Sequence, residues 1–108
     1  EAAHHHLDNL IGIVDNNKLQ IDGPVSEVMN VEPLAEKYRG FGWEVVQING
    51  HDMKQIVIAL TKAKEGVGRP ILIIADTVKG KGVSFMENVP GWHGKAPSCE
   101  QGELAVKV

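Results

Sequence analysis

Two short runs of apolar residues constrain the fold of this chain more strongly than any other feature. Leu10–Val14 and Ile71–Ala75 are mostly β-branched, and neither run has a polar side chain that would face solvent. Runs of this kind are typical of strands in a parallel sheet, where both faces of each strand are covered. Trp43–Ile48 predicts a third strand, which lies between the two runs along the chain.

Helical patterns separate these three strands. The first spans about residues 32–41, with Pro33 suited to a first helical position. The second begins after Asp52, which is a predicted N-cap with Gln55 as its capping-box partner, and it ends near Gly66. The order β-α-β-α-β predicts an α/β fold with three layers, in which a parallel sheet has helices on both faces.

Length and composition indicate one domain or part of one. The chain has 108 residues, of which 43% are hydrophobic, and a net charge of −3. This weakly acidic balance argues against a nucleic acid bound through its phosphates. No apolar run approaches the roughly 20 residues that a membrane helix needs. The single cysteine, Cys99, cannot form an internal disulfide, so a reducing, cytoplasmic location is expected. From Cys99 to Val108 the tail predicts the start of a final helix.

The first ten residues, EAAHHHLDNL, predict the last turns of a helix that runs into the first strand. Together with the missing initiator methionine, this pattern indicates that the chain is incomplete. His4–His6 are alternatively a tag remnant, although three histidines are few for that purpose. A zinc site made by these neighbours is disfavoured, because adjacent side chains on a helix point in different directions.

Two long polar segments, Asp15–Gly23 and Asp76–Pro97, follow predicted strand ends. In parallel sheets, ligands bind at the carboxyl ends of the strands, so chemistry is expected in these segments. The first begins with Asp15–Asn17, whose oxygens suit a hard ion such as Mg²⁺ or Ca²⁺. These residue types are also common turn formers, and local composition alone favours the turn. The short turn Asn49–His51 is a third candidate, but it is typical of a plain strand-to-helix link.

The second polar segment contains a basic, glycine-rich turn and an isolated histidine. Lys79–Gly82 places two cations among glycines, which lets the backbone approach an anion such as a diphosphate. A flexible basic loop is the alternative, since the turn lacks the Gly-Lys-Ser/Thr ending of a Walker A loop. His93 lies in the loop Gly91–Pro97, where it can donate to phosphate or transfer protons near neutral pH. An ordinary surface histidine is the alternative there.

Three longer segments that contain these features resemble transketolase. They are LDNLIGIVDNNKLQIDG, EPLAEKYRGFGWEVVQINGHD and PILIIADTVKGKGVSFMENVPGWHGKAP. In order and spacing they match the later part of the thiamine-diphosphate-binding domain at the transketolase N-terminus. The resemblance covers the chain from about His4 to Pro97. It is strongest to the type of enzyme that is split into an N-terminal and a C-terminal subunit.

The resemblance implies roles for five positions. It implies that the side-chain oxygen of Asn17 and the backbone carbonyl of Leu19 bind Mg²⁺, or Ca²⁺ in its place. Ile21 is expected to lie against the cofactor, which is thiamine diphosphate. Lys79 and His93 are expected to reach the diphosphate, and His93 is also expected to meet the substrate as a catalytic residue. The two residues before Asn17 then keep turn-forming roles.

The chain departs from the family pattern because parts of the site are missing. The Gly-Asp-Gly half of the cofactor motif is absent, as are the upstream histidines and the glutamate of the pyrimidine-binding domain. We therefore expect residues 1–108 to form a partial, diphosphate-side thiamine-diphosphate-binding domain that lacks its N-terminal part. The expected partners are sugar phosphates and a C-terminal subunit or pyrimidine-binding domain, within a homodimer or heterotetramer.

The activity that the resemblance implies is transfer of a two-carbon ketol group from a ketose phosphate to an aldose phosphate, as in the pentose phosphate pathway. The isolated chain is expected to be inactive, because it supplies only a fraction of one site. Two alternatives stay open: a transketolase-like enzyme of another sugar pathway, and a non-catalytic fragment that acts only in subunit pairing. A Rossmann-type nucleotide-binding domain is disfavoured, because no G-x-G-x-x-G follows the first strand.

Overall fold

The computed structural model describes residues 1–107 and divides into two compact units. The first, called the sheet unit, comprises Glu1–Asn16 and Val31–Thr77. The second, called the loop unit, comprises Asn17–Asn30 and the chain from Val78 onward. The chain passes from one unit to the other after residues 16, 30 and 77.

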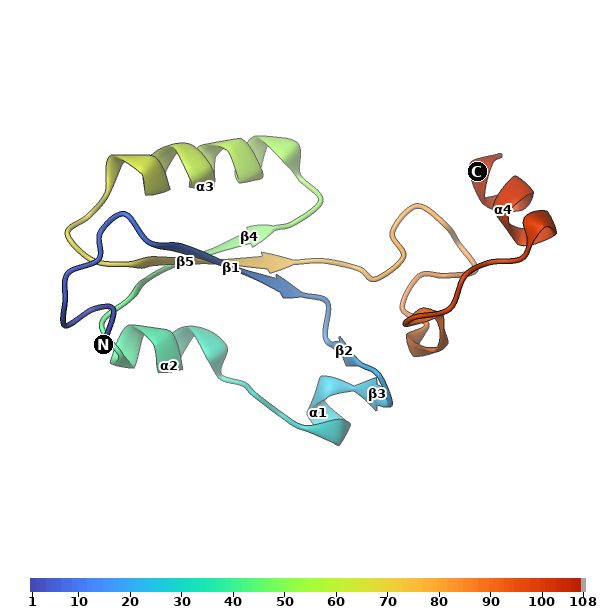
Figure 1. Cartoon of the computed structure of the whole chain (residues 1–108), viewed down its shortest axis with the longest axis horizontal. Coiled ribbons are helices and arrows are strands. Elements are labelled where there is room, and N and C mark those ends of the chain that lie inside the picture. The colour runs from blue at the N-terminus through green and yellow to red at the C-terminus, as the bar shows by residue number, and fades with distance from the viewer. Residues whose placement is uncertain (108) are drawn as a thin grey trace. The chain divides into compact units, whose positions relative to one another are not determined.

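The sheet unit contains a three-stranded parallel sheet in the order β1-β5-β4 (Figure 1). β1 spans Ile11–Asn16, β4 spans Glu44–Asn49 and β5 spans Ile71–Asp76. Asn16 and Asn49 both pair with Asp76, so the three strands end at the same level. The three strands predicted from the sequence are confirmed, and their parallel arrangement is confirmed with them.

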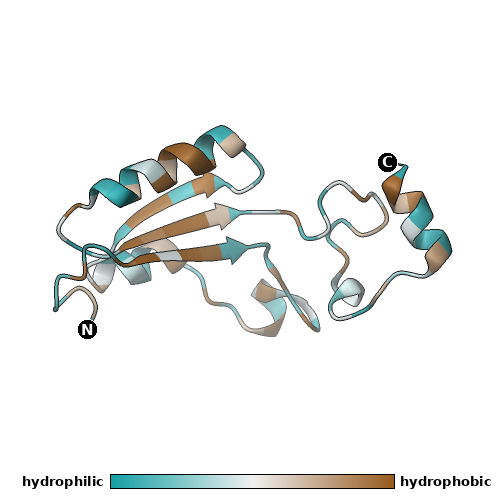
Figure 2. Ribbon diagram, turned by 45° about the horizontal axis from the view of Figure 1, so that its top comes forward, coloured by the Kyte–Doolittle hydropathy of each residue, from teal (hydrophilic) through white to brown (hydrophobic). Residues whose placement is uncertain are grey.

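Two helices cover opposite faces of this sheet (Figure 1). α3, Met53–Glu65, packs on the face that carries Ile73, and α2, Leu34–Gly40, packs on the face that carries Ile74. Successive side chains of a strand point to opposite faces, so β5 is buried from both sides and its residues 71–74 are only 1–3% exposed. Figure 2 shows these apolar strands between the helices, with hydrophilic residues at the strand ends. The predicted three-layer α/β fold is confirmed.

The first strand is less buried than its sequence predicts. The run Leu10–Val14 has the composition of a strand covered on both faces, but Ile13 is 62% exposed. In the described chain β1 is an edge strand, because β5 lies between it and β4. Both covering helices contact β4, at the opposite edge of the sheet, and Ile13 of β1 is left largely uncovered.

A polar cluster joins the carboxyl ends of the three strands. Asn16 Nδ2 donates to Asp76 Oδ1 at 2.8 Å, and Gln47 Nε2 donates to Asp76 Oδ2 at 2.7 Å. The Thr77 hydroxyl donates to the Asp15 carboxylate. Asp15 and Asn16 are therefore the last residues of β1, and the turn-forming role predicted for them is wrong. Their side chains form hydrogen bonds with residues at the end of β5 and just after it, so β1 continues to Asn16 and the turn begins at Asn17.

The N-terminal residues form turns where the sequence predicts the end of a helix. Their hydrogen bonds are nevertheless those of a helix C-terminus: Leu7 N donates to Ala2 O at 3.1 Å, and His6 N donates to Ala3 O at 3.1 Å. His6 has a φ of 51°, the left-handed conformation that closes such a motif. The predicted helix end is thus present in its hydrogen bonding, although these residues are not a helix.

The helix starts follow the predicted capping residues only in part. The Asp52 carboxylate accepts from Lys54 N at 2.9 Å and from Gln55 N at 3.2 Å, which confirms Asp52 as the N-cap of α3. Gln55 does not complete a capping box, because its Oε1 accepts from Asn49 N at 2.9 Å. Pro33 is the N-cap of α2 instead of its first residue.

The loop unit consists of short elements joined by turns. β2, Leu19–Gln20, pairs antiparallel with β3, Gly23–Pro24, and α1 spans Val25–Val28. A 3-10 helix, η1, spans Pro90–Trp92, and α4 spans Cys99–Val106. α4 confirms the predicted tail helix, of which Val108 lies outside the described residues. Within residues 1–107, no helix has the length and apolar character that crossing a membrane requires.

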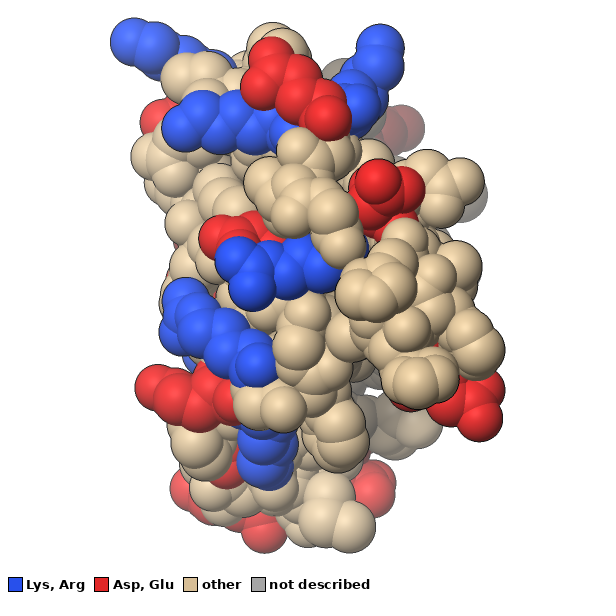
Figure 3. Space-filling view, turned by 90° about the vertical axis from the view of Figure 1, so that its left-hand side faces the viewer, with Lys and Arg blue, Asp and Glu red and all other residues tan. Residues whose placement is uncertain are grey.

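Charges of both signs are mixed where the strands begin. Figure 3 shows this end of the molecule, with lysine and arginine side chains standing among aspartate and glutamate side chains. Arg69, just before β5, pairs with Glu44 at the start of β4, with 2.9 Å between Nη2 and Oε2. Mixed charge of this kind differs from the continuous basic surface on which a nucleic-acid backbone binds.

Candidate functional site

One pocket of about 430 Å³ lies within the loop unit. Its lining residues come from two stretches of chain and are Asn17, Leu19, Gln20, Ile21, Asp22, Lys79 and His93. All five positions to which the resemblance assigns a role are among them, although the two stretches lie far apart in sequence. The structure thus brings these five residues together in one cavity, and what each of them binds stays a prediction.

Asn17 opens the turn that builds one wall of the pocket. Its Oδ1 accepts a hydrogen bond from Leu19 N at 2.9 Å, and Lys18 between them has a φ of 64°. Val25 N donates to Lys18 O at 2.8 Å, which ties the turn to the start of α1. An amide oxygen has two lone pairs, so Asn17 Oδ1 can close the turn and still bind a cation. Turn formation and metal binding are therefore compatible at Asn17.

The tip of the β2–β3 hairpin adds an apolar and an acidic group to the same wall. Ile21 and Asp22 form the two-residue turn between the strands, and Ile21 is 67% exposed. Gln20 Nε2 donates to Met29 O at 2.8 Å, which fixes the hairpin to the residue after α1. Ile21 offers apolar surface beside the oxygen atoms of Asn17, Leu19 and Asp22. This combination suits a ligand that has both apolar and charged parts.

Lys79 enters the pocket from a tight turn. Its neighbour Gly80 has a φ of 73°, and a Cβ at that position would lie 2.7 Å from Met86 O. The second lysine of the turn, Lys81, has its Nζ 3.8 Å from Glu87 Oε1. Among residues 1–107, no hydrogen bond or ion pair involves the Lys79 ammonium. Lys79 is thus the lysine of this turn that is available to bind an anion.

His93 follows η1 and is held in place by its backbone. His93 N donates to Pro90 O at 2.9 Å. Next to it, Trp92 Nε1 donates to Phe85 O at 3.2 Å, and the Trp92 and Phe85 ring centroids are 5.8 Å apart. Lys95 Nζ lies 5.3 Å from the centroid of the Trp92 ring, within cation–π range. These contacts shape the loop, and the His93 side chain is exposed at the pocket, where its functional role stays a prediction.

The pocket combines two kinds of polar group. Lys79 and His93 provide nitrogen donors for phosphate oxygens, while Asn17, the Leu19 carbonyl and Asp22 provide oxygens for a hard cation. In the part of the chain that the structure describes, no group of three His, Cys, Asp or Glu side chains could hold a metal ion. Mg²⁺ requires near-octahedral oxygen coordination, so an ion here needs further oxygens from a diphosphate, water or another chain. The donor set therefore fits a metal bound together with a diphosphate better than a bare ion.

A match to a model of a protein family shows which proteins this chain is related to. The model is described as transketolase, thiamine diphosphate binding domain, and it matches residues 1–106. The chain belongs to this family. Two similar proteins are an apulose-4-phosphate transketolase subunit from Phocaeicola vulgatus, at 42% identity, and the 6-deoxy-6-sulfo-D-fructose transketolase subunit SqwG of a Clostridium species, at 43%. The alignments cover 95% and 97% of this chain but only 37% and 38% of those relatives, so the chain spans well under half of their length.

Solved transketolase structures share the fold of the chain. The transketolase from Campylobacter jejuni matches with a TM-score of 0.77 at 40% identity, over 82% of this chain and 14% of that one. A Pichia stipitis transketolase in complex with sedoheptulose-7-phosphate matches with a TM-score of 0.76 at 33% identity, over 83% and 13% of the two chains. The parallel sheet with helices on both faces is thus an architecture that the chain shares with the transketolase family.

Sequence reasoning missed four residues of this transketolase-family pocket and its surroundings. Gln20 and Asp22 line the pocket, whereas Glu87 and Trp92 hold its loops. Asp22 stands before Gly23 and predicts no more than a turn, although an acidic group beside a candidate metal loop is a usable signal. Glu87 has the opposite charge to a lysine in the nearby glycine-rich turn, and that complementarity is also visible in the sequence.

The third sequence candidate, the turn Asn49–His51, does not line this pocket. It lies in the sheet unit, where His51 N donates to Asn49 Oδ1 at 2.9 Å. Gly50 sits there in a tight place, because a Cβ would lie 2.5 Å from Thr77 Cγ2. The turn is thus a packed strand-to-helix link, as its sequence predicts.

Proposed function

We propose that the protein containing this chain is a transketolase that requires thiamine diphosphate and Mg²⁺, or Ca²⁺ in its place. In this proposal the chain is a partial cofactor-binding domain that supplies part of the diphosphate and metal site. The observation that carries the proposal is the loop-unit pocket, which joins Asn17 and Leu19 to Lys79 and His93. Membership of the thiamine-diphosphate-binding family supports the cofactor. The reaction is transfer of a two-carbon ketol group from a ketose phosphate to an aldose phosphate.

Five of the residues that line the pocket have a role in this reaction. The Asn17 side-chain oxygen and the Leu19 carbonyl hold the metal ion, and Lys79 binds the diphosphate as a cation. Ile21 packs against the apolar part of the cofactor. His93 donates to the diphosphate or to a substrate hydroxyl, and it assists proton transfer. When bound, thiamine diphosphate supplies the nucleophilic carbon and the electron sink for carbon–carbon bond cleavage.

The substrate that we propose is a sugar outside the pentose phosphate pathway. Two of the similar proteins are named for apulose-4-phosphate and for 6-deoxy-6-sulfo-D-fructose. Those names apply to the relatives, and they favour a specialised sugar over the pentose phosphates for this chain. Assays of the complete enzyme with a panel of donors and acceptors that includes both kinds of sugar test this proposal. Turnover of the pentose phosphates alone would contradict it.

A second subunit or domain completes the proposed site. Two relatives are named as transketolase subunits, which supports a partner that carries the pyrimidine-binding domain, in a homodimer or a heterotetramer. A cytoplasmic location is part of the same proposal, and the exposed free thiol of Cys99 is consistent with a reducing compartment.

Thiamine diphosphate is predicted to bind weakly or not at all to the 108 residues alone. The pocket offers few of the oxygens that a Mg²⁺ ion requires, and nothing in it is assigned to the pyrimidine ring. Calorimetric titration with thiamine diphosphate and Mg²⁺ measures this directly, with the full-length protein and its partner as the positive control. Tight one-to-one binding by the isolated residues would contradict the proposal that the site is shared.

Replacement of Lys79 by methionine in the complete enzyme is predicted to weaken thiamine-diphosphate binding about 30-fold, which corresponds to about 2 kcal/mol for one charge-assisted contact. Lys81→Met is the matched control, because Lys81 belongs to the same turn but pairs with Glu87. We expect that variant to stay within about 3-fold of wild type, as is common for exposed ion pairs. Calorimetry at a fixed Mg²⁺ concentration compares the two. Equal losses in both variants would mean that the turn acts through its total charge.

A further inference from the structure

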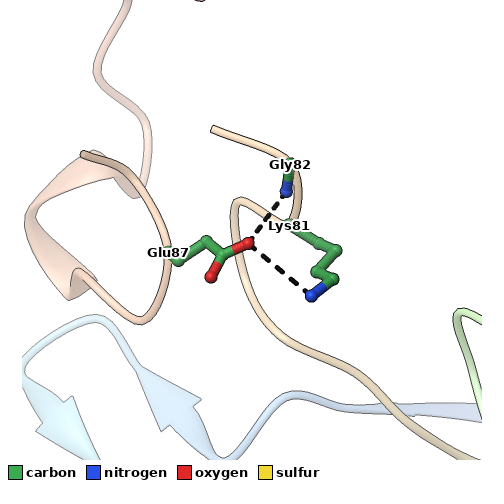
Figure 4. A network of polar contacts seen from close by, with 3 residues as sticks. All are labelled: Lys81, Gly82 and Glu87. Carbon is green, nitrogen blue, oxygen red and sulfur yellow. Dashed lines mark hydrogen bonds and ion pairs between the residues drawn. The ribbon is translucent and has the colours of Figure 1, made fainter. Parts of the chain in front are cut away.

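Glu87 contacts two parts of the Lys79–Gly82 turn at once (Figure 4). Its Oε1 accepts a hydrogen bond from Gly82 N at 3.0 Å and lies 3.8 Å from Lys81 Nζ. The Glu87 side chain is only 35% exposed, whereas that of Lys81 is 54% exposed. A single carboxylate oxygen therefore meets both the backbone of the turn and its second lysine.

The two arms of this turn, Lys79–Gly80 and Lys81–Gly82, are held in different ways. On the first arm, Gly80 is wedged against Met86, and Asn88 N donates to Lys79 O at 2.9 Å. On the second arm, nothing lies within 4 Å of a Cβ built on Gly82, which has a φ of 96°. Backbone hydrogen bonds hold the neighbours of Gly82, from Lys81 N to Val78 O at 3.1 Å and from Val83 N to Gly80 O at 3.1 Å. The amide of Gly82 itself donates to Glu87, which is the side chain that holds the second arm at this residue.

We propose that Glu87 is a positioning residue that fixes this turn, pairs with Lys81 and thereby leaves Lys79 as the lysine that faces the diphosphate. The inference rests on the proposed function, because the anion in question is the diphosphate of the cofactor. Lys79 lines the pocket and Lys81 does not. Glu87 contacts neither the pocket nor, in this proposal, the cofactor, so it acts only through the turn.

Electrostatics alone predicts the opposite effect for removal of Glu87. Loss of a carboxylate makes the turn more positive, so a bound anion would gain in both Glu87→Ala and Glu87→Gln. Positioning predicts that the two variants differ. The glutamine amide oxygen can still accept from Gly82 N, whereas alanine removes the hydrogen bond and the ion pair together.

Calorimetric titration of the complete enzyme with thiamine diphosphate and Mg²⁺ separates these possibilities. We expect Glu87→Ala to bind about 10-fold more weakly than wild type, which is about 1.4 kcal/mol. We expect Glu87→Gln to stay within about 3-fold of wild type, a difference of under 1 kcal/mol. Because Glu87 acts through Lys79, Glu87→Ala should add little to the loss caused by Lys79→Met. Equal or tighter binding by Glu87→Ala, or a loss that adds in full to that of Lys79→Met, overturns the proposal.

Hydrogen exchange at the Gly82 amide gives a readout that does not depend on the cofactor. We expect faster exchange at this amide in Glu87→Ala than in wild type, and wild-type exchange in Glu87→Gln. An unchanged rate in Glu87→Ala overturns the positioning role, even if every variant folds. If Lys79→Met binds thiamine diphosphate as tightly as wild type, the proposed function is overturned instead. The exchange rates at the Gly82 amide then still decide whether Glu87 fixes the turn.

Discussion

Replacement of Asn17 by alanine in the complete enzyme will raise the Mg²⁺ concentration needed for half-maximal thiamine-diphosphate binding about 100-fold. Even the loss of a residue that only orients a metal ligand typically lowers metal affinity about 10–100-fold. Mg²⁺ tolerates little departure from octahedral geometry, so neighbouring groups do not compensate for a lost protein oxygen. The second assigned ligand, the Leu19 carbonyl, belongs to the backbone, which makes Asn17 the one that mutation can remove. Cofactor titrations over a range of Mg²⁺ concentrations provide the measurement.

The Asn17→Ala change removes the proposed metal ligand and also a hydrogen bond, because Asn17 Oδ1 accepts from Leu19 N at 2.9 Å. These two effects have to be separated. Asn17→Asp is the matched control, since its carboxylate can accept the same hydrogen bond and bind the same ion. We expect that variant to bind the cofactor at Mg²⁺ concentrations close to those of wild type. High Mg²⁺ should restore binding in Asn17→Ala if a metal ligand was lost. Cofactor binding that is unchanged in Asn17→Ala, or a loss that no Mg²⁺ concentration restores, contradicts the metal-ligand role.

The layers of the fold could be predicted because burial leaves a local signature. β5 is the clearest example, since Ile71–Ile74 are apolar in sequence and 1–3% exposed in the structure. The end of β1 could not be predicted in the same way. Asp15 and Asn16 have the composition of a turn, but Thr77 and Asp76 hold them in the strand. These partners lie 60 and 62 residues away in sequence, so no local pattern contains them.

The candidate site shows the same division between local and non-local information. Residue types alone favoured a turn former at Asn17 and left Lys79 either in an anion-binding turn or in a flexible loop, and only the resemblance to transketolase linked the two residues. The structure places both in one pocket. The supporting contacts were not predicted, because Glu87 and Trp92 act through backbone atoms of residues 82 and 85. A backbone acceptor or donor has no sequence signature of its own.

Replacement of Gly80 by alanine is expected to lower the free energy of unfolding of the loop unit by about 2–5 kcal/mol and to weaken cofactor binding more than any single lysine change. About 1–2 kcal/mol comes from a side chain at a φ of 73°. About 1–3 kcal/mol more comes from overpacking, because the new Cβ would lie 2.7 Å from Met86 O and 2.8 Å from Met86 C. Both of these are backbone atoms, so no side-chain rotation relieves the contact and the turn that carries Lys79 must move.

Gly82→Ala is the matched control for this change, since the two glycines differ in packing more than in conformation. Gly82 has a φ of 96°, but nothing lies within 4 Å of a Cβ built there. We expect a cost of about 1–2 kcal/mol from backbone conformation alone, and a smaller loss of cofactor affinity. Glu87 accepts from Gly82 N, which alanine retains, so the contact that fixes this arm survives the change. Chemical denaturation and calorimetry on both variants measure the difference. Equal losses would show that the contact between Gly80 and Met86 does not set the position of Lys79.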